Sequence, residues 1–312
     1  MIRDGATIVV APPRPSIRGS TALASIETIF SALISGILLG GMLALTALGL
    51  SIVLGVMRLV NIAHGEFLVA GAYAGLFFLQ VTGIDPLIGL ALIALGLGAL
   101  AYPLQRILIR PIADKGPEAP MMTMFGVSVI LQNLFVLAFS ADTRSIERDY
   151  AVVALHLGPV TVPQIYVIGF AISAVTILAV HLLISRTAFG RDLRASADDP
   201  RAAGIIGINV SRVHALTFAL GAACAGAGGT LVGIAFSFTP SSGATYLLTD
   251  FAIIVLGGLG NVLGTLLGGV IIGVLQSAGG LVLGDGYRDL TGFVLFLIVL
   301  ALRPQGFLKG RA

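Results

Sequence analysis

The most polar motif at the edge of an apolar run is Asn-Ile-Ala-His-Gly-Glu-Phe, residues 61–67. Its side chains are candidates to line or gate a path across a membrane, because ionisable groups near lipid are costly and often functional. His64 and Glu66 are two positions apart, so on a helix they face different ways and do not form a metal pair. A structural alternative stays open, in which Asn61 caps the helix and Glu66 favours its positive end.

The sequence lacks the common motifs of enzymes and of nucleotide-binding proteins. Both lysines, Lys115 and Lys309, are followed by Gly, whereas a P-loop lysine follows Gly and precedes Ser or Thr. The sequence has no HExxH and no GxSxG, and Cys224, the only cysteine, excludes an intrachain disulfide and a multi-cysteine metal site. We therefore expect no enzyme, no metal and no cofactor, and any ATP that drives this protein must bind to another chain.

Asp250 stands alone between two long apolar runs, shortly after Pro240 and Gly243. We expect it at the water interface, as an acid near a helix N-terminus. A proton relay is the less favoured alternative.

The segments that must position these residues are strongly apolar. Apolar residues make up 57% of the 312 and charged residues 11%, about half the charged share of a soluble domain. Mean hydropathy is +1.03, so lipid is the expected solvent. The net charge of +3 does not indicate a nucleic-acid partner, because the arginines cluster in loops, as they do in the cytoplasmic loops of membrane proteins.

Eight stretches are almost free of charge, and a membrane span needs about 20 residues. We predict an all-α fold, a polytopic transmembrane helical bundle of about eight membrane segments. Residues 28–57 are long for one helix and short for two, and 246–283 are interrupted by Gly-Gly-Leu-Gly-Asn. Whether these two regions hold broken or half-helices stays open. The stretches are 28–57, 67–84, 86–105, 119–141, 150–185, 213–249, 251–284 and 290–302.

The chain divides into a polar tail, 1–27, and one transmembrane domain, 28–310. The tail lacks the apolar core of a cleaved signal. Arg and Lys mark 186–212 as a cytoplasmic coupling loop, which leaves 142–160 as an external loop with a β-like segment at 150–155. The side of the N-terminus stays open, because helix counting places it outside whereas the arginines of the tail favour the inside.

Gly260, Gly264 and Gly268 repeat at a spacing of four. Such small residues let helices cross closely. Ordinary helix packing is the expected role, and a subunit interface is the alternative.

Three blocks, in the right order, resemble the branched-chain amino acid permeases, the membrane subunits of ABC importers. They are residues 44–75, 189–229 and 251–276, and residues 303–310 resemble the C-terminal end of the family. The likeness runs from about residue 28 to residue 310 and is strongest to the first of the two permeases that pair in these systems.

The resemblance also assigns the coupling segment. In importer permeases the ATPase-docking helix often carries Glu-Ala-Ala, then three residues and Gly. Here Arg201 replaces the acid, while Ala202, Ala203 and Gly207 match. Small residues would let the helix fit a groove in the ATPase, and Gly207 would end it; Asp198 or Asp199 is the candidate to supply the missing carboxylate.

The resemblance implies a multi-pass permease in the bacterial inner membrane that imports branched-chain or related amino acids. It implies as partners a second permease subunit, two ABC ATPase subunits, a periplasmic or extracellular solute-binding protein and membrane lipid. Urea or short-chain amides are alternative substrates. An ion-coupled secondary transporter is a competing class, but it would need acids or bases inside the spans, and the apolar runs offer little beyond Glu66 and Asp250.

Overall fold

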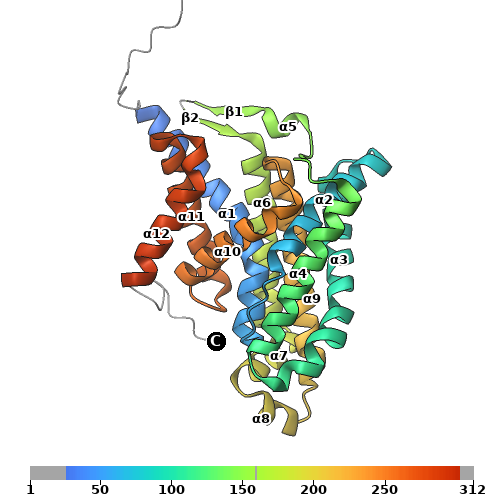
Figure 1. The fold of residues 1–312 in the computed structure, drawn as a ribbon. Coiled ribbons are helices and arrows are strands. Elements are labelled where there is room, and N and C mark those ends of the chain that lie inside the picture. Colours follow the sequence, from blue (N-terminus) through green and yellow to red (C-terminus); the bar gives the residue numbers. More distant parts are fainter. Residues whose placement is uncertain (1–25, 159, 303–312) are drawn as a thin grey trace, which may run out of the picture.

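Long apolar helices make up most of the chain in the computed structural model, which describes residues 26–158 and 160–302 (Figure 1). The predicted tail up to residue 25 and the segment 303–310 lie outside the described residues. The elements are α1 (Ile26–Met57), α2 (His64–Thr82), α3 (Pro86–Leu104), α4 (Glu118–Phe139), α5 (Asp149–Val152), β1 (Ala154–Leu157), β2 (Val160–Pro163), α6 (Gln164–Arg186), α7 (Ala188–Asp198), α8 (Pro200–Ile205), α9 (Val210–Ala235), α10 (Gly243–Gly257), α11 (Val262–Leu283) and α12 (Arg288–Leu302).

Seven of the described helices are long and apolar enough to cross a membrane: α1, α2, α3 with its extension to Lys115, α4, α6, α9 and α11. The helices α10 and α12 have 15 residues each, which is short for a full span. The prediction of an all-α helical bundle of about eight segments is confirmed.

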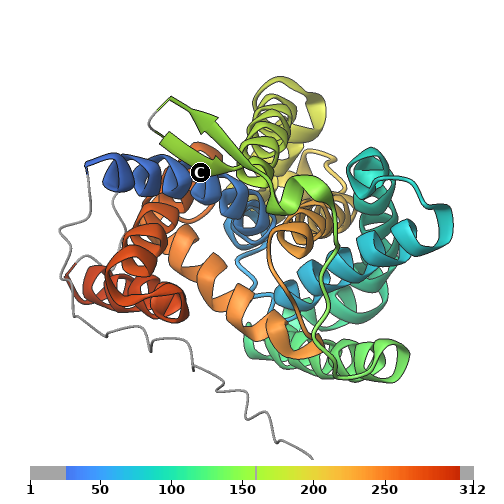
Figure 2. The same cartoon turned by 90° about the horizontal axis from the view of Figure 1, so that it is seen from above.

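The first apolar run forms one continuous helix, α1, of 32 residues, so the broken or half-helix considered for residues 28–57 does not form. It is buried along most of its length because α6, α9 and α11 pack around it, and a helix buried on all sides needs no polar face. Glycines set the closest approach: a Cβ on Gly40 would lie 2.4 Å from the carbonyl oxygen of Gly269 on α11. Figure 2 shows α11 and α12 (red) on one side of the bundle and α2, α3 and α4 (cyan to green) on the other.

The run 246–283 is broken into α10 and α11. Gly258 and Gly260 take positive φ angles of 88° and 75°, which glycine adopts without strain, and the Asn261 side chain accepts from the Gly264 backbone N–H at 2.9 Å to cap α11. Gly260 corrects one expectation, because it lies in this turn against Gly55 of α1 and not on a helix. Gly264 and Gly268 do lie on α11, against the backbone of α10.

The two ends of the bundle differ. In Figure 1, α7 and α8 lie at one end and the β1–β2 hairpin at the other. The helix α1 begins at the hairpin end, where the Thr161 backbone N–H donates to the Ser31 hydroxyl at 3.0 Å. This placement agrees with the helix count and puts the start of α1 opposite the basic segment 186–212.

The predicted external loop, 142–160, is only partly β-like. Residues 149–152 form one helical turn, the strand begins at Ala154, and α6 begins at Gln164. The Tyr150 hydroxyl donates to Asp85 at 2.8 Å, and Asp85 also caps α3 by accepting from the Leu87 N–H. Burial, reinforced by the hydrogen bond and the negative charge of Asp85, raises the pKa of Tyr150 well above its usual value.

Candidate functional site at the start of α2

The helix α2 starts inside the bundle. After α1 ends, Arg58 takes a left-handed backbone with φ of 50° and the chain turns back, so that His64, the first residue of α2, reaches the Thr46 carbonyl at 2.9 Å. Figure 1 shows the start of α2 at mid-height of α1. Asn61, His64 and Glu66 are therefore all buried, with 2%, 1% and 4% of their surface exposed.

Asn61 shapes this turn in a way that differs from the expected cap. Its side-chain oxygen accepts from the Ala63 N–H at 3.1 Å, and its carbonyl accepts from the His64 N–H at 3.2 Å. The position before α2 is Ala63, which has no side-chain cap. The Asn61 side chain thus closes a tight turn two residues before the helix, a local bond that Asn favours.

His64 faces α1 and α10. Its Nε2 carries a hydrogen, because the Thr46 carbonyl can only accept, and the same nitrogen lies 3.5 Å from Asp250 Oδ2. The Thr46 hydroxyl donates to Asp250 Oδ1 at 2.6 Å. Three elements therefore meet in one polar cluster that water barely reaches.

Asp250 is the residue that sequence reasoning misplaced. It lies midway along α10 and is 1% exposed, so the expectation of a water-exposed position is wrong. Its partners come from positions about 200 residues earlier in the chain, which no local pattern indicates. The available signal was the general cost of an acid inside an apolar segment.

Glu66 faces the other way, toward α4 and the first residue of α10. Ser128 of α4 donates to Glu66 Oε1 at 3.3 Å. The carboxylate rests on Gly243, the first residue of α10, where a Cβ would lie 2.5 Å from Oε1. Among the described residues, Glu66 Oε2 has no hydrogen-bond partner.

An aromatic cluster lies two turns further along the same face of α2. Tyr73 stacks on Phe139 with ring centroids 4.3 Å apart and contacts Phe135 at 5.3 Å, both from α4. Phe238, from the segment before α10, packs edge-on against Tyr73 at 5.0 Å. The α2–α4 boundary thus holds a carboxylate at one level and four aromatic rings at another.

The basic segment 186–212 folds into the short helices α7 and α8. Asp199 caps α8 by accepting from the Arg201 and Ala202 backbone N–H groups at 2.8 and 3.1 Å, so it is engaged within the chain. Arg201 and Ala202 are exposed and Ala203 is buried. Gly207 has φ of 92°, two residues after α8 ends.

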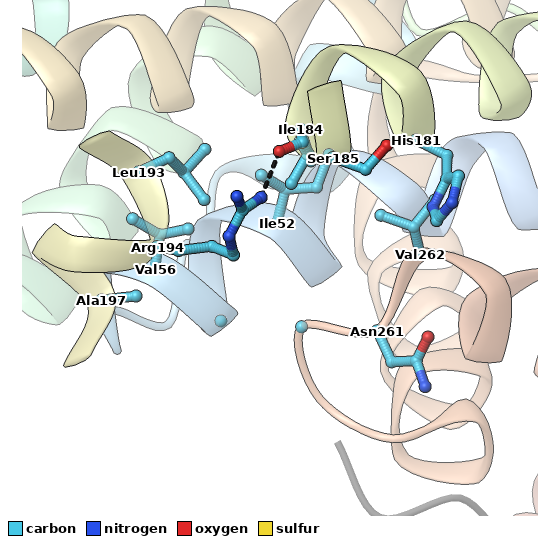
Figure 3. Close-up of a pocket in the computed structure, with 12 residues that line it drawn as sticks. Ile52, Val56, His181, Ile184, Ser185, Leu193, Arg194, Ala197, Asn261 and Val262 are labelled. Carbon is cyan, nitrogen blue, oxygen red and sulfur yellow. Dashed lines mark hydrogen bonds between the residues drawn. The ribbon is translucent and has the colours of Figure 1, made fainter. Parts of the chain in front are cut away.

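Two contacts tie α7 to the membrane helices. Arg194 donates to the carbonyl of Ile184 near the end of α6, and Arg58 donates to the carbonyl of Ala197 at 3.4 Å. Arg194 lines a cavity of about 230 Å³ between α1, α6, α7 and the α10–α11 turn. Figure 3 shows Arg194 on one side of this cavity and His181 and Asn261 on the other. The basic segment therefore connects directly to the turn that leads into α2.

Metal ligation finds no support in the described chain. Within residues 26–158 and 160–302, no three His, Cys, Asp or Glu side chains are grouped as a metal site.

The sequence is similar to known membrane transport proteins over most of its length. Residues 32–302 match the family described as "Branched-chain amino acid transport system / permease component". The high-affinity branched-chain amino acid transport system permease protein BraD of Pseudomonas aeruginosa is 31% identical over 88% of this chain and 94% of that protein. LivH of Escherichia coli, with the same description, is 30% identical over 88% of this chain and 93% of that protein. A solved structure, PsaBC from Streptococcus pneumoniae in complex with Fab, covers 90% of this chain and 94% of that chain at 16% identity and a TM-score of 0.48.

Proposed function

The chain belongs to the family of branched-chain amino acid transport system permease components, and from this premise we propose that it is the membrane permease subunit of an ABC importer for branched-chain or related amino acids. It is a multi-pass membrane protein with seven candidate spans in its described part, and we place it in the bacterial inner membrane. The observation that carries the proposal is the family match across residues 32–302.

We propose that ATP is hydrolysed by two separate ABC ATPase subunits and that the permease itself binds no cofactor. The docking segment would be α8 and its flanks, with Arg201, Ala202, Ala203 and Gly207. Ile205 and Ile206, 86% and 74% exposed, give this tip an apolar surface that suits a groove in a partner. The contacts of Arg194 and Arg58 would carry motion from α7 to the membrane helices.

A second permease subunit is a further proposed partner. Salmonella typhimurium has two similar proteins described as permeases of the high-affinity branched-chain amino acid transport system, LivH and LivM. LivM is 27% identical to this chain over 96% of the chain. A periplasmic or extracellular solute-binding protein would deliver the substrate to the end that carries the β1–β2 hairpin.

Within the permease, we propose that Asn61, His64 and Glu66 belong to the translocation path or its gate. The observation in favour is their burial at the start of a helix that begins inside the bundle. Urea or short-chain amides remain alternative cargo for the same machinery. The buried acids Glu66 and Asp250 favour an ion-coupled secondary transporter, and the family match weighs against that class.

ATP hydrolysis gives a direct test. The purified chain alone should hydrolyse no ATP, because it lacks the lysine motif of a P-loop. Co-expressed with the second permease and the ATPases, it should co-purify with them and support hydrolysis that increases with binding protein and leucine. Hydrolysis by this chain in isolation would overturn the proposal.

A further inference from the structure

We infer that the free carboxylate oxygen of Glu66 binds the ammonium group of the transported amino acid, at a subsite where α2, α4 and the first turn of α10 meet. This inference rests on the proposed function, and it names the chemical group that the path recognises.

One carboxylate oxygen of Glu66 is buried without a partner among the described residues. Only 4% of the Glu66 surface is exposed, and Oε2 has no hydrogen-bond partner among the described residues. A buried carboxylate oxygen is expensive to leave unpaired. A cationic group that donates hydrogen bonds is the ligand that best removes this cost.

The two other polar residues of the motif, Asn61 and His64, already have partners within the chain. The Asn61 side chain closes its own turn, and His64 Nε2 is shared between Thr46 and Asp250. None of the ion pairs formed by the described residues includes Glu66. Glu66 is thus the member of the motif that keeps a charge-bearing atom available for a ligand.

The charge of the surroundings favours a cation over an anion. Ser128 supplies one neutral donor to Oε1, and Gly243, the first residue of α10, lies against the carboxylate. Gly243 permits this approach because it lacks a Cβ. An ionised carboxylate without a basic partner attracts positive charge.

The aromatic cluster suits the rest of such a ligand. Tyr73 follows Glu66 by seven positions, hence about 10 Å along the same face of α2. The rings of Tyr73, Phe135, Phe139 and Phe238 pack on one another and make this level of the α2–α4 boundary apolar. A carboxylate followed by apolar rings matches an amino acid that carries an ammonium group and a hydrocarbon side chain.

Access to the subsite is through α4. Only Pro120, Met124 and Val127 of this helix are buried. A single helix with few buried residues therefore covers Glu66. Ser128 and Gln132 are one turn apart on α4 and partly exposed, and Asn133 is exposed. Ser128 and Gln132 thus form a partly exposed polar strip on a helix whose most exposed large side chains, such as Ile130 and Leu137, are apolar.

The test is charge-selective cysteine labelling in the reconstituted complex with ATP. Cys224, the only native cysteine, is 3% exposed, so the parent protein provides the blank. Ser128→Cys is labelled with an ethylammonium methanethiosulfonate and with a sulfonatoethyl methanethiosulfonate, and each rate is divided by the rate with a free thiol. We expect the normalised rate for the cationic reagent to exceed that for the anionic reagent by at least tenfold, and Glu66→Gln to reduce the ratio to about one.

Ligand protection identifies the group that binds. Leucine should slow cationic labelling of Ser128→Cys several-fold, and 4-methyl-2-oxopentanoate, which lacks the ammonium group, should not. Ile130→Cys is the matched control, because Ile130 is 60% exposed and lies on the opposite side of α4 from Ser128. Its labelling rates should not change with Glu66→Gln. Gln132→Cys replaces Ser128→Cys if the latter does not fold.

Equal normalised rates for the two reagents, or a ratio unchanged by Glu66→Gln, would overturn the inference. So would the absence of any labelling at positions 128 and 132. If ATP-driven leucine uptake persists in that case, the proposed function stands and only the subsite fails. A charge-selective site without leucine protection would instead contradict the ammonium assignment.

Discussion

The Thr46 hydroxyl of α1 donates a 2.6 Å hydrogen bond to the Asp250 carboxylate of α10, and neither residue is more than 1% exposed. The bond joins the longest helix of the bundle to a half-helix. His64 of α2 contacts both residues. The cluster therefore holds α2 and α10 in position against α1.

Thr46→Val should destabilise the protein by about 1–3 kcal/mol, because Asp250 Oδ1 loses its donor in a buried position. The measurement is thermal unfolding in detergent, followed by a thiol-reactive dye that reaches the buried Cys224 only when the bundle opens. Thr176→Val is the control, because its hydroxyl bonds only the carbonyl of Ile172 within α6, and its effect should stay within about 0.5 kcal/mol. Equal unfolding temperatures for the two variants would show that the cluster contributes nothing.

Gly229→Ala should be strongly disruptive. A Cβ at this position of α9 would lie 1.9 Å from the carbonyl oxygen of Leu68 on α2, and two backbones cannot separate without a cost of about 1–3 kcal/mol. Gly96→Ala on α3 is the matched control, because no atom lies within 4 Å of its Cβ, and alanine favours a helix by about 0.5–1 kcal/mol over glycine. The same dye assay distinguishes the two, and a stable Gly229→Ala protein would mean that α2 and α9 are not in close contact.

Much of the fold was predictable because membrane spans are encoded by composition. The bundle, the break at Gly257–Asn261 and the end of α8 before Gly207 all follow from local residue types. The burial of Asp250 was not predictable, because its partners Thr46 and His64 are distant in sequence. The four-residue spacing of glycines predicted Gly260 on the same helix as Gly264 and Gly268, and this was wrong. Gly260 has a turn conformation, which the spacing alone does not reveal.

Gly207→Ala should weaken coupling without removing the protein from the membrane. Its φ of 92° strains any residue with a Cβ by about 1–2 kcal/mol, so the end of α8 should shift. Gly204→Ala, within α8 and with open space around its Cβ, is the control and should be tolerated. Co-purification with the ATPases and ATP-driven uptake are the readouts, and full association and uptake by Gly207→Ala would contradict a docking role.

Tyr150→Phe should make stability less sensitive to high pH. Burial and Asp85 raise the pKa of the Tyr150 hydroxyl in the folded protein, above the unfolded value of about 10, so its contribution is complete below that pH and is lost as the pH rises further. The variant should lose about 0.5–1.5 kcal/mol below pH 10, with the hydrogen bond to Asp85. Unfolding measured from about pH 8 to pH 11 should therefore show a shallower decline in the variant, and parallel curves for the two proteins would contradict this assignment.

The central claim is that this chain is an ATP-driven permease for amino acids, and uptake in proteoliposomes tests it most directly. The chain is reconstituted with the second permease and both ATPases, the binding protein and labelled leucine are supplied outside, and ATP is enclosed. We predict leucine accumulation that requires ATP and every subunit and that stops when the enclosed ATP is replaced by a non-hydrolysable analogue. Accumulation driven by a proton or sodium gradient in vesicles that contain this chain alone would contradict the account.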